Sequence, residues 1–263
     1  MSTPQSTDFP ATLLPALEDA AREAGRAVME VYDGPITVTT KADSSPVTEA
    51  DARAEAIIVP VLRRLTPHIP VVAEEAMAAG DRQDISEGTF WLVDPLDGTK
   101  EFIARNGQFT VNIGLILKGR PALGVVLAPA QNRLWSGCAG HGATVVEADG
   151  SRKAIHCRKV PARGAVVVAS RSHGNAGPLE TWLASLDAPE LLQAGSSLKF
   201  CLVATGEADF YPRFGPTCEW DVAAAHGVLV AAGGEVYDWQ GKVLGYGKPN
   251  FLNPHFLARS TID

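Results

Sequence analysis

The sequence predicts an α/β protein in which layers of helices and sheets form two parts. Two amphipathic helical patterns open the chain, with apolar side chains on one face over residues 13–31 and again over 48–65. Short apolar runs that favour strands follow at 71–72, 90–93, 109–117 and 122–127. From about residue 160, helix-like and strand-like segments alternate, which indicates a second, smaller α/β part.

The first part is predicted to combine its two helices with an antiparallel sheet. A strand-like run at 36–40 separates the helices. Thr48 and Asp51 have the spacing of a capping box at the start of the second helix, and Pro60 is expected to kink that helix. The turn-forming sequence KGRP joins the last two strands, and such a short connection predicts antiparallel pairing.

The second part is predicted to begin near residue 162, where Pro161 and Gly164 mark the change of pattern. The expected domains are therefore 1–162, with the antiparallel sheet, and 163–263. Strands are predicted in the second domain at 165–169, 209–211 and 234–237, and helices at 178–186, 197–206 and 219–232.

Composition narrows the classes of partner. With 23 Lys and Arg against 30 Asp and Glu, the formal charge is −7, so no basic face is expected to bind nucleic acid or anionic lipid. The four cysteines form no CxxC pair, which is typical of reduced thiols in a cytosolic protein. The N-terminal residues do not resemble a secretory signal, and the longest apolar run is too short to span a bilayer. We expect a cytoplasmic monomer or homodimer; a peripheral position at the inner face of the membrane remains open.

Acidic residues at element ends are the first candidates for chemistry. Asp94 and Asp97 follow a buried-looking strand, Glu74 follows another apolar run, and Asp221 begins a late helix. Mg²⁺ prefers several such oxygen ligands, but each residue could instead be a helix cap or a solvated turn. A helix cap is the favoured interpretation of Asp221 taken alone. For Glu74 taken alone, a structural role and a functional role are equally supported. For Asp94 and Asp97 together, function is favoured. The DxDxDG spacing of a calcium EF-hand is absent.

These acids lie in sequences that resemble a known family. WLVDPLDGT (91–99), with EE at 74–75 and WD at 220–221, resembles the inositol monophosphatase superfamily. GSSLKFCLVA (195–204) and YPRFGPT (211–217) resemble its bacterial 3′(2′),5′-bisphosphate nucleotidase branch. The resemblance spans nearly the whole chain and implies the layered αβαβα sandwich shared with fructose-1,6-bisphosphatase. It also implies a Mg²⁺-dependent, lithium-sensitive phosphomonoesterase.

The implied reaction removes the 3′-phosphate of adenosine 3′,5′-bisphosphate, a by-product of sulfate assimilation, to give AMP and phosphate. 3′-Phosphoadenosine 5′-phosphosulfate is a second candidate substrate. In the resemblance, two or more Mg²⁺ ions are bound by the carboxylates of Glu74, Asp94, Asp97 and Asp221 and by the carbonyl of Leu96.

The resemblance also assigns the remaining roles. Asp51 and Thr99 correspond to a dyad that positions and deprotonates the attacking water. Independently of the resemblance, backbone N–H groups of Gly98 and Thr99 are expected to bind phosphate oxygens if a helix starts there. The nucleotide-binding positions of the family match His173, Ser196, Lys199 and Arg213.

Two alternatives stay open at this point. One is an inositol or sugar monophosphatase, which the substrate preference would distinguish. The other is a non-catalytic nucleotide sensor with the same fold. The presence of both Asp51 and Thr99 argues against the sensor, which would not need to activate water.

Overall fold

The computed structural model describes residues 9–40, 46–170 and 176–261. Its helices are α1 (Phe9–Thr12), α2 (Leu14–Asp33), α3 (Glu49–Leu65), α4 (Glu74–Ala78), α5 (Thr99–Ile103), α6 (Ala176–Leu183), α7 (Leu198–Ala204) and α8 (Trp220–Ala231), with 3₁₀ turns η1 (Pro129–Gln131) and η2 (Pro249–Phe251). Its strands are β1 (Val38–Thr40), β2 (Pro46–Thr48), β3 (Val71–Ala73), β4 (Phe90–Asp97), β5 (Thr110–Leu117), β6 (Arg120–Ala128), β7 (Arg133–Cys138), β8 (Gly142–Val146), β9 (Arg152–Ile155), β10 (Val166–Ala169), β11 (Glu190–Gln193), β12 (Phe210–Arg213), β13 (Gly234–Asp238) and β14 (Phe256–Ser260).

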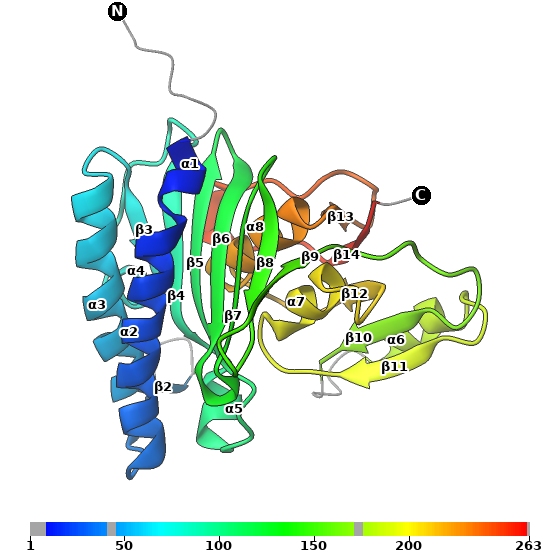
Figure 1. Cartoon of the computed structure of the whole chain (residues 1–263), viewed down its shortest axis with the longest axis horizontal. Helices are drawn as coiled ribbons and strands as arrows, with labels where there is room; N and C mark the ends of the chain where they lie inside the picture. The colour runs from blue at the N-terminus through cyan, green and yellow to red at the C-terminus, as the bar shows by residue number, and fades with distance from the viewer. Residues whose placement is uncertain (1–8, 41–45, 171–175, 262–263) are drawn as a thin grey trace, which may run out of the picture.

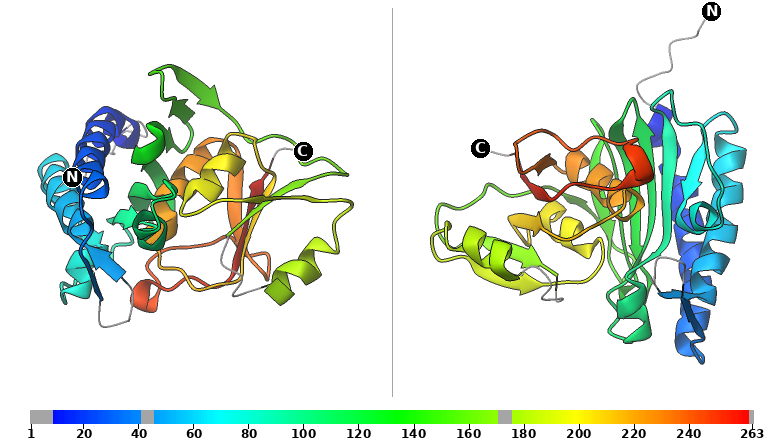
Figure 2. Two further views of the ribbon diagram at one scale, coloured as in Figure 1. Left: turned by 90° about the horizontal axis from the view of Figure 1, so that it is seen from below. Right: turned by 180° about the vertical axis from the view of Figure 1, so that it is seen from behind.

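The elements form five layers, α, β, α, β and α, as predicted (Figures 1 and 2). Helices α2 and α3 cover one face of a seven-stranded sheet, β3 to β9, and the side-by-side helices α7 and α8 pack between this sheet and the second one. The second sheet has five strands in the order β11-β10-β12-β14-β13. Helix α6 packs on its outer face, where Trp182 meets Phe210.

The long strands of the first sheet are buried on both faces because helices cover both. In β5 every residue except the last is buried, a pattern that alternation of apolar and polar residues would not produce. β3 runs parallel to β4, and the strands from β4 to β9 follow one another in antiparallel pairs. The strands joined by KGRP are β5 and β6, so the predicted hairpin is confirmed.

Helix α3 begins at the predicted capping box. The Thr48 side chain accepts from Ala50 N at 3.2 Å, while Asp51 Oδ2 accepts from Thr48 N at 2.8 Å. Both bonds satisfy donors that the first turn of a helix leaves unpaired. The helix continues through Pro60 to Leu65.

Several elements were not predicted from the sequence. β7, β8 and β9 extend the first sheet, and β11 and β14 belong to the second. The four cysteines are free thiols, and no helix in the described ranges is long and apolar enough to cross a bilayer. The boundary at residue 162 lies in the connection between β9 and β10, and the division into two domains stays a prediction.

Candidate active site

The end of β4 holds two of the predicted metal ligands at an irregularity of the sheet. Asp94 pairs with Asn112 of β5 and Asp97 with Thr110, and the register shifts between these two pairs. Pro95 lies in the shifted segment, where a residue without an N–H group costs no ladder bond. Asp94 is 2% exposed, and its Oδ1 accepts from Leu96 N at 3.0 Å. The irregularity therefore brings both carboxylates to the same end of the strand.

Two other carboxylates reach the same place from different elements. Glu74 begins α4 directly after β3, the parallel neighbour of β4, and Asp221 is the second residue of α8. Burial raises the pKa of Asp94 well above its usual value, and the charges of Glu74, Asp97 and Asp221 raise it further. Burial also raises the pKa of Asp221, followed by the charge of Asp97. The four acids are thus close enough to repel one another.

The free oxygens of this cluster suit a hard cation. Asp94, Asp97 and Asp221 each use one oxygen to accept backbone N–H groups, from Leu96, Ser197 and Cys218 respectively. Their other oxygens accept no hydrogen bond from the described part of the chain. Among the described residues, no group of three or more His, Cys, Asp or Glu side chains is positioned to hold a metal ion as it stands. The donor set nevertheless fits Mg²⁺ chemically, because it consists of oxygens whose repulsion a cation would relieve.

The two residues of the predicted dyad, Asp51 and Thr99, each make separate hydrogen bonds. Asp51 is 1% exposed, and its Oδ2 accepts from both the backbone and the hydroxyl of Thr48 at 2.8 Å. Burial raises its pKa, and the charge of Glu75 adds to the increase. Thr99 begins α5, and its hydroxyl donates to the Leu96 carbonyl at 3.3 Å. No hydrogen bond between Asp51 and Thr99 occurs in the described structure, and their joint role stays a prediction.

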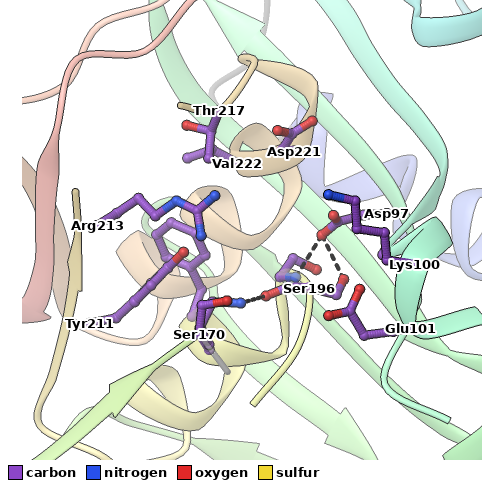
Figure 3. A pocket seen from close by; sticks show the side chains of 14 residues that line it. Asp97, Lys100, Glu101, Ser170, Ser196, Tyr211, Arg213, Thr217, Asp221 and Val222 are labelled. Atoms are coloured by element: carbon purple, nitrogen blue, oxygen red, sulfur yellow. Dashed lines mark hydrogen bonds between the residues drawn. The ribbon is translucent and has the colours of Figure 1, made fainter. Parts of the chain in front are cut away.

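A cavity of about 190 Å³ is lined by two of the four acids, Asp97 and Asp221, and by predicted nucleotide-binding residues (Figure 3). Its wall includes six residues predicted from the sequence: Asp97, Gly98, Ser196, Lys199, Arg213 and Asp221. It also includes Lys100, Glu101, Ser170, Tyr211 and Thr217, to which the sequence analysis assigned no role. His173, the remaining predicted nucleotide-binding residue, lies outside the described residues. The wall of the cavity therefore contains both carboxylates and cations, with Arg213 across from Asp97 (Figure 3).

Lys199 is an amine enclosed by the protein at the edge of this cavity. Its side chain is 3% exposed, and Nζ donates to the Ser196 carbonyl at 2.5 Å and lies 5.2 Å from the centroid of the Tyr211 ring. Burial lowers its pKa to about 8, and the Arg213 charge contributes to the decrease. The amine is still mostly protonated at neutral pH, so it can bind an anion.

Arg213 is held by the loop that follows β12. Its Nε donates to the Gly215 carbonyl at 3.3 Å and its Nη2 to the Pro216 carbonyl at 3.1 Å. These bonds orient the guanidinium toward the cavity, across from Asp97 (Figure 3). A planar donor in this position suits a phosphate oxygen.

Glu219 supports the site in a way that the sequence did not reveal. Its carboxylate is completely buried and accepts from Gly247 N at 2.9 Å and Lys248 N at 2.8 Å, with Lys248 Nζ at 2.7 Å. Glu219 therefore fastens a distant loop beside the start of α8, which carries Asp221. The motif EWD contained this signal, but only its last residue had an expected role.

Comparisons with known proteins show to which family the chain belongs. Residues 10–261 match the model of the inositol monophosphatase family. The chain belongs to the inositol monophosphatase family. It is 54% identical over 240 residues to the 3′(2′),5′-bisphosphate nucleotidase CysQ of Escherichia coli O6:H1, covering 90% of this chain and 95% of the relative. The CysQ nucleotidase of Buchnera aphidicola is 42% identical and covers 90% of both chains.

Solved structures of the family have the same fold. The structure of CysQ from Bacteroides thetaiotaomicron superposes with a TM-score of 0.80 at 37% identity, over 94% of this chain and 97% of that one. An inositol monophosphatase from Anabaena reaches a TM-score of 0.74 at 26% identity, over 95% and 91% of the two chains. The fold class inferred from the sequence is thereby confirmed.

Proposed function

We propose that this protein is a 3′(2′),5′-bisphosphate nucleotidase that removes the 3′-phosphate of adenosine 3′,5′-bisphosphate. The observation that carries the proposal is the cavity whose wall contains the acids Asp97 and Asp221 together with the cations Lys199 and Arg213. A substrate with two phosphate groups needs two separated sites for negative charge, one reactive and one for binding only. The curated nucleotidases at 54% and 42% identity support the same reaction.

We propose Mg²⁺ as the metal, with two or more ions bound by Glu74, Asp94, Asp97, Asp221 and the Leu96 carbonyl. When bound, Mg²⁺ supplies the positive charge that acidifies the attacking water and neutralises the leaving oxygen. Asp94 and Asp221 favour this role because their raised pKa values reflect a charge that the protein alone does not balance. A cytoplasmic location and a monomeric or dimeric state remain predictions.

The other residues would act on the water and on the substrate. Asp51 accepts a proton from the attacking water, and Thr99 orients that water. Backbone N–H groups of Gly98 and Thr99 bind oxygens of the reacting phosphate. Lys199 and Arg213 bind the part of the nucleotide that does not react, and they hold the reactive phosphate in position.

A phosphate-release panel tests the proposed reaction. Adenosine 3′,5′-bisphosphate, 3′-phosphoadenosine 5′-phosphosulfate and inositol 1-phosphate are compared with Mg²⁺, with Mg²⁺ plus lithium, and with excess chelator. We expect the bisphosphate to have the highest kcat/KM, with turnover reduced by lithium and lost in chelator. Preference for inositol 1-phosphate would favour the monophosphatase alternative, whereas full turnover in chelator would refute the role of a metal.

Replacing Arg213 by Ala tests how the nucleotide is recognised. A charge-assisted hydrogen bond contributes about 1.5–3 kcal/mol, or roughly 10- to 150-fold in affinity. We expect kcat/KM for the bisphosphate to fall by such a factor, and kcat/KM for a small monophosphate to change much less. Arg259→Ala is the control, because it removes a guanidinium that lies over the Tyr237 ring and does not line the cavity. An equal loss for both substrates would make Arg213 a structural residue.

A further inference from the structure

Two polar residues lie inside the buried strand β5, where the neighbouring residues are apolar. Thr110 and Asn112 have no exposed surface, and their cross-strand partners are Asp97 and Asp94. Polar side chains in such a position are costly unless they form hydrogen bonds. Their bonds extend to the turn at Ser196, which carries residues of the nucleotide side of the cavity.

The protons of this cluster run in one direction, toward Asp97. Ser196 Oγ donates to Asp97 Oδ2 at 2.5 Å, and Ser197 N donates to the same oxygen at 2.7 Å. Thr110 Oγ1 lies 2.5 Å from Ser196 Oγ. Because Ser196 has one hydroxyl proton and an ionised carboxylate can only accept, Thr110 must be the donor in this contact. Thr110 thus orients the hydroxyl that orients Asp97.

Asn112 fixes the second serine of the turn. Asn112 Oδ1 lies 2.8 Å from Ser197 Oγ and 3.3 Å from Thr110 Oγ1, and these two hydroxyl oxygens are 2.8 Å apart. Because the proton of Thr110 goes to Ser196, the one proton of Ser197 goes either to Asn112 or to Thr110. The buried Nδ2 of Asn112 finds no hydrogen-bond partner among the described residues. Exchanging the oxygen and nitrogen of the amide would leave the oxygen unpaired instead. One end of this buried amide, beside Asp94 on the neighbouring strand, can therefore still form a hydrogen bond with another polar group.

The turn itself needs this support. Ser196 has φ +52°, in the left-handed region that is strained for a residue with a side chain. Its carbonyl accepts the Lys199 amine, while its hydroxyl binds Asp97. The turn consequently connects a predicted metal ligand at one end to a predicted nucleotide-binding cation at the other.

We propose that Thr110 is a positioning residue, which together with Asn112 holds the turn at Ser196 and Ser197 against Asp97. The inference rests on the proposed function, since it takes Asp97 as a metal ligand and Lys199 as a nucleotide-binding group. Through this contact, Thr110 determines both how Asp97 presents its free oxygen to Mg²⁺ and where the Ser196 carbonyl holds Lys199. Thr110 itself touches neither metal nor substrate.

Four variants separate the hydroxyl of Thr110 from its bulk. Thr110→Val exchanges the hydroxyl for a methyl group, Thr110→Ser keeps the hydroxyl, and Thr110→Ala removes both groups. The control is Thr66→Val, because Thr66 is equally buried and its hydroxyl also makes two bonds, to the Leu62 carbonyl at 3.1 Å and from Trp91 Nε1 at 2.8 Å. Both changes to valine remove a bonded hydroxyl from the core, but only the one at Thr110 lies beside Asp97.

The primary measurement is Mg²⁺ binding by titration calorimetry without substrate. Groups that orient a metal ligand typically change metal affinity by about 10- to 100-fold. We expect Thr110→Val and Thr110→Ala to weaken Mg²⁺ binding by at least the lower of these factors, with Thr110→Ser and Thr66→Val close to wild type. In turnover assays, Thr110→Val should also raise KM for adenosine 3′,5′-bisphosphate at saturating Mg²⁺, because Lys199 shares the displaced turn.

Other results overturn the inference. Mg²⁺ affinity in folded Thr110→Val equal to wild type refutes it, as does an equal loss in Thr66→Val or a wild type that binds no Mg²⁺. If Thr110→Val does not fold, the comparison of Thr110→Ala with Thr110→Ser decides. If Thr110→Ala is also unfolded, the Thr110 side chain has a purely structural role, and the proposal that Thr110 positions Asp97 is refuted. A wild type that binds Mg²⁺ but does not hydrolyse the bisphosphate refutes the proposed function alone, because the calorimetric comparison is unaffected.

Discussion

Asp94 is a residue whose buried charge destabilises the metal-free fold but suits metal binding. Its carboxylate is buried among Glu74, Asp97 and Asp221, so its charge is unfavourable until a cation binds. The only hydrogen bond that the described residues give it comes from Leu96 N. Asparagine could keep that bond while removing the charge. The residue is therefore better suited to binding a metal than to stabilising the fold.

The change Asp94→Asn should stabilise the metal-free protein and abolish its response to Mg²⁺. We expect the free energy of unfolding in chelator to rise by about 1–2 kcal/mol, the usual gain when a functional residue is relieved of strain. In wild type, Mg²⁺ at about 100 times its Kd should add about 2.7 kcal/mol, and in the variant much less. Urea denaturation with and without Mg²⁺ measures both effects.

Asp149→Asn is the matched control for this prediction. Asp149 Oδ1 accepts from Ser151 N, two residues ahead, just as Asp94 Oδ1 accepts from Leu96 N, but Asp149 lies in an exposed turn. Its substitution should change neither stability in chelator nor the response to Mg²⁺. A metal-free Asp94→Asn protein less stable than wild type would show that the carboxylate stabilises the fold.

The predicted dyad is tested by Thr99→Ala and Asp51→Asn. Each should lower kcat by about two or more orders of magnitude, the scale of positioned base catalysis, and leave nucleotide affinity nearly unchanged. Asp51 also completes the cap of α3, so Thr48→Ala, which removes the capping hydroxyl and its bond to Asp51 but keeps the carboxylate, serves as the control. That variant should lose about 1 kcal/mol of stability but much less turnover. Near-normal kcat with a raised KM would contradict the assignment of Asp51 and Thr99.

At the scale of elements, α8 links the site to the core. Its first turn carries Asp221, and further along it packs against β4, β5, β6, β7, β8 and β13. The helix approaches the sheet very closely because glycines face each other across the contact. A Cβ on Gly124 of β6 would lie 1.8 Å from the Ala224 carbonyl oxygen, and one on Gly227 would lie 2.7 Å from the Leu123 carbonyl carbon. The position of Asp221 therefore depends on how closely α8 packs.

Gly124→Ala should displace α8 and weaken the whole protein. Overpacking a core usually costs about 1–3 kcal/mol, and a clash between two backbones is at the upper end or beyond. We expect the free energy of unfolding to fall by about 3 kcal/mol or more, with a loss of Mg²⁺ affinity because Asp221 moves with the helix. Gly177→Ala is the control, since Gly177 is exposed in the first turn of α6 with open space around it, and its stability should change by less than about 0.5 kcal/mol. Unchanged stability in Gly124→Ala would contradict this account.

Elements with strong local patterns were predicted correctly from the sequence, and those defined by distant contacts were not. The capping box of α3 and the hairpin of β5 and β6 depend on neighbouring residues, so their patterns are visible in the chain. By contrast, β11 is exposed along its whole length and has no apolar pattern of its own. It forms a strand because β10 is beside it.

The site divides in the same way. Asp94 and Asp97 were found because they stand together beside a strand end, within a motif. Thr110 and Asn112 look like ordinary strand residues in the sequence. Their relation to the acids arises from the cross-strand register and from the turn at Ser196, which is distant in the chain. Neither relation is encoded locally.

At the scale of the whole molecule, α7 and α8 join the two sheets into one core. Val126 and Trp135 of the first sheet belong to the same buried cluster as Val228 of α8 and Phe256 of the second sheet. The cavity also takes its residues from both halves, with Asp97 from one and Arg213 from the other (Figure 3). The halves separated at residue 162 by the sequence pattern would thus share one interior.

A shared interior predicts that the halves cannot unfold independently. Residues 1–162 alone lack α8, so the apolar face formed by residues such as Phe90, Leu92 and Ile116 would be exposed to water. We expect this fragment to show no cooperative unfolding transition. In the whole protein, hydrogen exchange measured in increasing urea should give the same midpoint for peptides from β5 and β6 as for peptides from β12 and β14, because both sheets lose their packing when α8 detaches. Two separate midpoints, or a folded fragment, would instead establish residue 162 as the boundary of an autonomous domain.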